Sequence, residues 1–346
     1  MNSVRDSLER LVESRAMNPF ATPGEDQFRP DHPSMSCVIP AFDECGNLET
    51  LLPELAALVG ALVERWEIIV VDDGSHDATP LLMSRLTKTP GYRYIQLSRN
   101  FGKEAALSAG IDAASGDVIV LLDADYQHPV TLISEMLGLW RNGADIAYAV
   151  RRDRHDESLL KRLGSALFYR ILGSNSRIHI PPNAGDFRLM DRCVVDAIKQ
   201  LPERTRFMKG LYAWVGFKAE PIIYDPAARQ HGRSRFSLPQ LMRFAVDGIT
   251  AFSTWPLRAL NATGTVIAIA SFLYGGYLVG DYFLNGHEVS GWTTIVTAQF
   301  FFSGINLLAL GTIGLYLARV FDEVKQRPLY LVRSDLGRMH GSSDSA

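Results

Sequence analysis

Two long segments of the chain contain no charged residue, and they limit most strongly what the sequence can fold into. They are Ala259–Gly280, with 22 residues, and Val289–Ala318, with 30 residues. A helix of 22 residues is about 33 Å long, and the hydrocarbon core of a bilayer is about 30 Å thick. Each segment is therefore long enough to cross a membrane. A buried helix pair in a soluble protein is the alternative, which Phe300–Phe302 and the many small residues disfavour.

The charges around these segments predict their orientation. The eight residues between them, Asp281–Glu288, include no Lys or Arg, whereas basic residues flank the pair outside, at Arg258, Arg319, Lys325 and Arg327. Lys and Arg collect on the cytoplasmic side of membrane proteins. We therefore expect a two-span hairpin over residues 257–321 in the inner (cytoplasmic) membrane. Both termini, including a tail over residues 322–346, are expected in the cytoplasm.

The composition of the sequence is typical of a folded protein, but its charged residues are unevenly distributed. The net charge is −3, but residues 151–235 hold 17 basic and 9 acidic residues, a local charge of +8. Such a segment suits an anionic ligand or a membrane surface, although an ordinary solvated face would also explain it. We expect no nucleic-acid partner. The three cysteines form no CxxC pair, so neither a thiolate zinc site nor a disulfide framework is supported.

After residue 33, short apolar runs alternate with helical patterns. The runs that predict strands are Ser36–Pro40, Glu67–Val71, Tyr92–Leu97, Asp117–Leu122 and Ile146–Val150. The patterns between them predict helices over Leu48–Val63, Thr79–Thr87, Lys103–Ala114 and Pro129–Asn142. Short strands separated by helices of this length indicate parallel βαβ units, which bind ligands at the carboxyl ends of the strands. The fold class is thus α/β with a mostly parallel, Rossmann-like sheet.

Two further helical segments have an apolar stripe and a basic or polar opposite side. We expect residues 158–172 and 236–256 to form amphipathic helices that lie in the membrane interface, with ordinary core helices as the alternative. The first belongs to a cytoplasmic domain over residues 34–235. Residues 1–33 are polar, include several prolines and predict a flexible leader.

The cluster Asp123-Ala124-Asp125-Tyr126-Gln127 follows the fourth predicted strand. In an extended chain, positions i and i+2 point the same way, so Asp123, Asp125 and Gln127 would present three oxygen groups together. Such oxygens suit Mg²⁺ or Mn²⁺, which also bind substrate phosphates. The alternative is a polar loop that caps the next helix, with Pro129 in its first turn.

Two other clusters follow predicted strands. Asp72-Asp73-Gly74-Ser75 can accept hydrogen bonds from a nucleobase or ribose, although an Asx turn that starts a helix has the same residues. In Pro40-Ala41-Phe42-Asp43-Glu44, the aromatic ring can stack on a base. The first strand is followed by no G-x-G-x-x-G, and Gly102-Lys103 lacks the Ser/Thr and earlier glycine of a P-loop. A dehydrogenase or P-loop NTPase is thus poorly supported.

Together these clusters resemble the family-2, GT-A-fold glycosyltransferases. The similarity is greatest to the polyprenyl-phosphate sugar transferases, which include bactoprenol glucosyltransferases and dolichol-phosphate mannose synthases. It also includes the block Ser98–Lys103 and extends through Gly185–Met190, Gly210–Gly216 and Gly232–Arg235, and covers roughly residues 34–330. At the last of these motifs the family usually has Lys where this chain has Arg235, which changes a point charge into a planar fork.

The resemblance implies a role for each matching residue. Nucleoside contacts would come from Pro40, Phe42, Glu44, Val71 and Asp73. The diphosphate would be held by Asp123, Ala124, Asp125 and Gln127, with Asp123, Asp125 and Gln127 as the metal site and the latter two as direct ligands. Donor phosphates would also contact Arg229 and Arg235. The acceptor phosphate would be bound by Arg151, Arg162, Arg206 and Lys209. Catalytic roles would fall to Asp186 and Asp125.

The resemblance also implies a reaction. A hexose, most simply glucose from UDP-glucose, would pass with inversion to a polyprenyl (undecaprenyl) phosphate, for modification of a cell-envelope or O-antigen glycan. UDP-galactose, UDP-amino-arabinose and GDP-mannose stay open as donors. A homotetramer is implied by resemblance alone. A polysaccharide synthase, a soluble transferase and a silent nucleotide-binding membrane scaffold are the alternatives. The missing QxxRW motif, the hairpin and the intact acidic residues, respectively, argue against them.

Overall fold

The computed structural model describes residues 29–152, 184–204, 206–224, 255–285, 291–337 and 339. The leader up to residue 28, the first expected interfacial helix and most of the second lie outside the described residues. The chain divides into two compact units. One contains the described residues up to 152, those of 184–224 and those from 328 onward, and the other contains residues 255–285 and 291–327.

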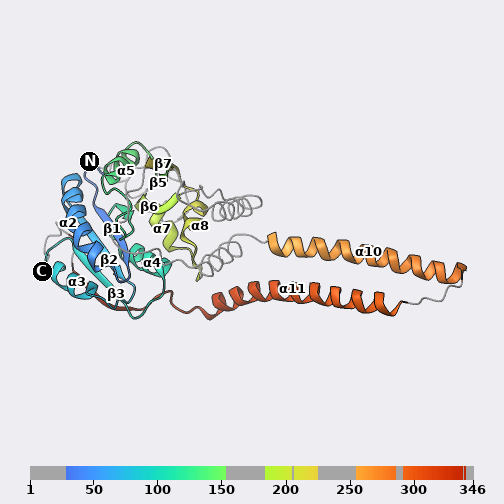
Figure 1. The fold of residues 1–346 in the computed structure, drawn as a ribbon. Coiled ribbons are helices and arrows are strands. Elements are labelled where there is room, and N and C mark those ends of the chain that lie inside the picture. The colour runs from blue at the N-terminus through green and yellow to red at the C-terminus, as the bar shows by residue number, and fades with distance from the viewer. Residues whose placement is uncertain are drawn as a thin grey trace, which may run out of the picture. The chain divides into compact units, whose positions relative to one another are not determined.

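The first unit is built on a mixed sheet (Figure 1). Among the described residues its strand order is β7-β5-β6-β4-β1-β2-β3-β8. The strands are β1 Met35–Ala41, β2 Trp66–Asp72, β3 Tyr92–Leu97, β4 Val118–Leu121, β5 Ile146–Arg151, β6 Ala184–Asp191, β7 Ala219–Tyr224 and β8 Val332–Gly337. The helices are α2 Cys45–Leu62, α3 Thr79–Leu86, α4 Lys103–Ala113, α5 Leu132–Arg141, α7 Arg192–Lys199 and α8 Met208–Trp214.

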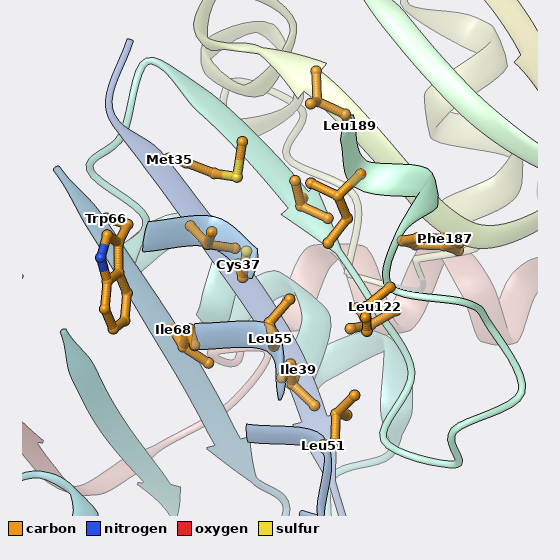
Figure 2. Close-up of a cluster of buried hydrophobic side chains, with 14 of the residues drawn as sticks. Met35, Cys37, Ile39, Leu51, Leu55, Trp66, Ile68, Leu122, Phe187 and Leu189 are labelled. Atoms are coloured by element: carbon orange, nitrogen blue, oxygen red, sulfur yellow. The ribbon is translucent and has the colours of Figure 1, made fainter. Parts of the chain in front are cut away.

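The centre of the sheet is parallel, as the sequence predicts. Strand β1 pairs in parallel with β2 and β4, and β2 pairs in parallel with β3. Every residue of β2 and β4 is buried, which agrees with a parallel sheet that is covered on both faces. Figure 2 shows Leu51 and Leu55 of α2 next to Cys37 and Ile39 of β1. Burial of this helical stripe against the sheet forms the main core.

Strand β6 changes the topology from the expected one. The series of predicted strands ran from β4 directly to β5, but β6 lies between them and is antiparallel to both. This strand contains Asp186 and Arg188, two charged residues that are nevertheless buried. These two charged residues interrupt the continuous apolar run that is typical of a central strand. The sequence therefore indicated a family motif at this position but no strand.

Part of the expected C-terminal tail forms a strand, β8. It pairs antiparallel with β3, and the Arg93 guanidinium donates to both oxygens of Asp335, with Nε–Oδ1 at 3.0 Å and Nη2–Oδ2 at 2.8 Å. The Ser98 amide donates to the Leu331 carbonyl at 2.8 Å. The strand therefore covers an edge of the sheet that would otherwise expose unpaired backbone groups.

The second unit contains two long apolar helices, drawn in orange and red in Figure 1. They are α10, Trp255–Asn285, with 31 residues, and α11, Trp292–Lys325, with 34 residues. Ala259–Tyr277 and Phe301–Lys325 are each long and apolar enough to cross a membrane. Both helices of the expected hairpin are thus confirmed as helices, whereas their orientation in a membrane stays a prediction.

The approach of α4 to the sheet depends on Gly110, and this generates the first testable prediction. A Cβ at Gly110 would overlap the Val38 side chain and lie 3.1 Å from Val71 Cγ2. We expect Gly110→Ala to lower the free energy of unfolding by about 1–3 kcal/mol, because the packed core must shift. Thermal and denaturant unfolding of the detergent-solubilised chain measures this.

The matched control is Gly138→Ala on α5, where an added Cβ meets nothing within 4 Å. Here the better helix propensity of Ala should leave the unfolding free energy unchanged or raise it slightly. Equal effects of the two substitutions would contradict the proposed close contact at Gly110.

Candidate active site

The predicted clusters meet at one edge of the sheet because β1, β2 and β4 are parallel. Their carboxyl ends lead into the loops that contain Phe42, Asp73 and Asp123. The loop after β3 leads into α4, whose first residue is Lys103. This is the edge at which α/β sheets bind ligands.

Lys103 forms the central ion pairs of this edge. Its Nζ lies 2.7 Å from Asp123 Oδ1 and 2.7 Å from Asp186 Oδ2. The three residues come from α4, from the loop after β4 and from β6. The ammonium group thus joins three separate elements, and the two carboxylates outweigh its partial desolvation and raise the pKa of Lys103 well above its usual value.

Asp186 is buried and ionised. Burial opposes its ionisation, but Lys103, Lys209 and Arg188 outweigh that effect and hold the pKa of this carboxyl well below its usual range. Its Oδ1 atom is buried and has no hydrogen-bond partner among the described residues. Asp186 therefore presents a fixed negative charge at neutral pH.

Asp73 holds the loop in front of α4. Its carboxylate accepts hydrogen bonds from the amides of Phe101 and Gly102, at 2.7 and 2.8 Å. Gly102 has φ of +101°, a conformation that glycine adopts readily. Burial is the largest influence on Asp73 and raises its pKa. In this structure the predicted nucleoside residue therefore fixes the loop that leads to Lys103.

The loops after β1 and β2 are hydrogen-bonded to each other. The Asp43 amide donates to Ser75 Oγ at 2.9 Å, and the His76 amide donates to Asp43 Oδ1 at 2.8 Å. The Phe42 ring meets the His76 ring edge-on, with centroids 6.4 Å apart. These contacts hold Phe42 at the carboxyl end of β1.

The other predicted nucleoside residues differ in their surroundings. Glu44 accepts a hydrogen bond from Asn47 Nδ2 at 2.6 Å, and Pro40 is partly exposed at the end of β1. Val71 is completely buried in β2, and its side chain faces α4 near Gly110. Ala124 is also buried.

The loop after β4 is a turn, which corrects one expectation. Asp123, Asp125 and Gln127 would share one side only in an extended chain. Instead the chain turns at residues 124–126, and Tyr126 has φ of +60°, in the left-handed region. The Gln127 amide donates to Asp125 Oδ1 at 3.2 Å. The turn brings Gln127 back towards Asp125, which alternation along a strand does not do.

The oxygen atoms of this turn fit a hard divalent cation. Asp125 and Gln127 offer carboxylate and amide oxygens, whereas one oxygen of Asp123 is already paired with Lys103. Among the described residues, no three His, Cys, Asp or Glu side chains gather into a metal site. Mg²⁺ is commonly held by one or two carboxylates together with substrate phosphates. The donor set therefore fits a cation that shares its coordination with a diphosphate.

His128 and Glu104 are site residues that the sequence reasoning missed. The His128 ring packs against Phe187 and Tyr224, and its Nε2 lies 4.0 Å from Asp123 Oδ2. Burial lowers the pKa of His128. Glu104, next to Lys103, accepts a hydrogen bond from the Met208 amide at 3.2 Å. The Ser98–Lys103 block was a signal for Lys103, whereas Glu104 directly follows that block and belongs to none of the quoted motifs.

The expected acceptor-phosphate residues are only partly brought together. Lys209 lies close enough to Asp186 to help lower the pKa of that carboxyl. Arg151 lies close enough to Tyr224 to oppose the rise that burial causes in the pKa of that hydroxyl. The Arg206 guanidinium instead donates to Ser108 Oγ at 3.2 Å and to the Leu201 carbonyl at 3.1 Å. Three expected phosphate contacts lie outside the described residues, namely Arg162, Arg229 and Arg235.

Comparisons with known proteins agree with this geometry. The sequence model described as glycosyl transferase family 2 matches residues 36–199. An uncharacterised glycosyltransferase from Synechocystis sp. is 46% identical over 303 residues, which cover 87% of this chain and 95% of the relative. An SfII prophage-derived bactoprenol glucosyl transferase from Shigella flexneri is 39% identical over 304 residues, covering 86% and 97%.

A solved structure is also similar. Glucosyl-3-phosphoglycerate synthase from Mycobacterium tuberculosis matches at 20% identity with a TM-score of 0.41, and the match covers 65% of this chain and 84% of that one. The sequence relatives, which match almost over their whole length, carry the assignment. The resemblance that the motifs indicated is therefore confirmed: the chain belongs to glycosyl transferase family 2 and is a glycosyltransferase with the GT-A fold.

Proposed function

We propose that the protein transfers a hexose from a nucleotide diphosphate to the phosphate of a polyprenol, at the cytoplasmic face of the inner membrane. The observation that carries this proposal is the Asp123–Lys103–Asp186 arrangement at the carboxyl edge of the sheet. The 39% identity to a bactoprenol glucosyl transferase and the two long apolar helices support a lipid-linked acceptor.

On the donor side, the residues would bind a nucleotide sugar. Phe42 and Asp73 lie at the ends of β1 and β2, where a nucleoside would bind. Asp125 and Gln127 would hold Mg²⁺ or Mn²⁺ against the diphosphate. When bound, the cation offsets the negative charge that the leaving nucleotide gains as the glycosidic bond breaks. Lys103 would orient the donor through Asp123, with which it forms an ion pair.

On the acceptor side, no strong base is needed. A phosphate monoester has a second pKa of about 6 and is mostly dianionic near pH 7. Asp186 has a depressed pKa and is ionised, so it acts as a fixed charge. Its role would be to orient the sugar or to stabilise positive charge at the anomeric carbon. Lys209 and Arg151 would reduce the repulsion between the two phosphates.

The donor would be UDP-glucose, which is consistent with a glucosyl transferase among the relatives, and the transfer would be a single in-line displacement with inversion. The purified chain, incubated with polyprenyl phosphate, should move label from UDP-glucose into the lipid phase. EDTA should abolish this transfer, and Mg²⁺ or Mn²⁺ should restore it. The same assay with labelled UDP-galactose, UDP-amino-arabinose and GDP-mannose checks the donor.

The outcomes separate the parts of the proposal. Label from another nucleotide sugar would replace UDP-glucose but keep the reaction class. Full transfer in EDTA would contradict the metal role of Asp125 and Gln127. If no nucleotide sugar labels the lipid, the proposed reaction is wrong.

Asp186→Asn tests the fixed charge next to the reacting atoms. We expect kcat to fall about 100- to 1000-fold, because a preorganised charge is lost while the shape is kept. Donor affinity, measured by calorimetry, should stay within a few-fold. Asp196→Asn is the control, because Asp196 is exposed on α7 and lies 3.8 Å from Arg192. Near-normal turnover of Asp186→Asn would remove Asp186 from the mechanism.

A further inference from the structure

A second, half-buried carboxyl group lies beside the site, and the proposed chemistry does not use it. Glu104 is the second residue of α4 and directly follows Lys103. Its Oε2 accepts a hydrogen bond from the amide of Met208 at 3.2 Å. Met208 is the first residue of α8, which is 104 positions further along the chain. This bond thus connects the start of one helix to the start of another.

A second bond on the same side of α4 supports the first. Ser108 is one turn after Glu104, and its Oγ accepts from Arg206 Nη1 at 3.2 Å. The same hydroxyl donates to the Glu104 carbonyl at 2.8 Å. Residues four positions apart share one face of a helix. Two side chains on one face of α4 therefore hold the segment from Arg206 to Met208.

The opposite end of α8 is held by β6. The Arg188 guanidinium lies over the Tyr212 ring, with Cζ 3.5 Å from the ring centroid, and its Nη2 donates to the Gly185 carbonyl at 2.7 Å. Lys209 lies between these two attachments. It directly follows Met208, and its charge helps to lower the pKa of Asp186. The position of Lys209 thus depends on how α8 is docked.

We propose that Glu104 is a positioning residue that, through the Met208 amide, holds Lys209 beside Asp186 for the acceptor phosphate. This inference rests on the proposed function, because it assigns the lipid phosphate to the Asp186 side of the site. Glu104 acts through α8 and does not contact the reacting atoms. A purely structural role would need only the hydrogen bond and would give no dependence on the charge of Glu104.

The charge of Glu104 gives the proposal a second consequence. The groups that face it are Lys103, Asp186, Arg188, Lys209 and Tyr212. Burial, and next Asp186, raise the pKa of Glu104 to about 8. The group is therefore mostly neutral at pH 7 and becomes negative as the pH rises through 8. Above that pH, a new negative charge lies beside Asp186 and opposes the incoming phosphate dianion.

Two variants of the full-length protein in detergent separate the bond from the charge. The probe is a short-chain polyprenyl phosphate, with labelled UDP-glucose, or the donor that the earlier assay identifies, at saturation. At pH 7, Glu104→Ala should raise the acceptor KM about tenfold because the Met208 amide loses its partner. Its kcat and donor KM should stay within about twofold. Glu104→Gln keeps an acceptor oxygen and should match the wild type at pH 7.

The dependence of the acceptor KM on pH distinguishes the proposal from a purely structural role, which would leave this dependence unchanged. Between pH 7 and 9 the acceptor KM of the wild type should rise several-fold, because Glu104 ionises, whereas that of Glu104→Gln should stay flat. Glu135→Gln is the matched control. Glu135 is also in the first turn of its helix, but it is exposed, so this variant should follow the wild-type profile.

Each result decides one point. Parallel profiles for the wild type and Glu104→Gln would overturn the charge effect, and equal rises in donor and acceptor KM for Glu104→Ala would overturn the positioning role. If Glu104→Ala does not fold, the nearly isosteric Glu104→Gln still decides the proposal by its pH profile. Absence of transfer by the wild type would instead contradict the proposed function itself.

Discussion

The ammonium group of Lys103 lies between two carboxylates, and the arrangement of the site depends on this interaction. Asp123 and Asp186 would repel each other at this partly buried edge of the sheet, and among the described residues no other Lys or Arg lies within 4.0 Å of either carboxylate. A lysine at the start of α4 offsets both charges. It also ties α4, the end of β4 and β6 together, so three elements that are distant in sequence share one small region.

The surrounding fold serves to place that lysine. Gly110 lets α4 lie directly on β1, and Asp73 fixes the loop before α4 through two backbone amides. The same loop begins at Ser98, whose backbone amide donates a hydrogen bond to the carbonyl of Leu331, the residue before β8. The chain that follows the second apolar helix thus returns to the catalytic sheet. Rigid support of this kind is what electrostatic catalysis requires, because preorganised charges need no rearrangement during the reaction.

A phosphate acceptor changes what such a site must do. A sugar hydroxyl would need a base, but a phosphate dianion is already a nucleophile, and the main difficulty is the repulsion between acceptor and diphosphate. Three cationic side chains, Lys103, Lys209 and Arg188, surround the ionised Asp186. Because their positive charge exceeds the single negative charge of Asp186, a second anion can bind there. In the proposed mechanism, Glu104 contributes by staying neutral at pH 7 and by holding α8.

The sequence by itself determined the central parallel strands, the two apolar helices and the family. These features depend on local patterns: continuous apolar runs, helical periodicity, and acidic motifs at the ends of strands. Tertiary structure alone decided the insertion of β6, the pairing of β8 with β3, and the meeting of Lys103 with Asp186. The turn at Tyr126 was also not predicted, because its left-handed backbone breaks the alternation of side chains that an extended strand would have. Buried charges such as Asp186 and Arg188 look like surface residues in a sequence. Only the partners that the fold brings to them, from positions far along the chain, make their burial possible.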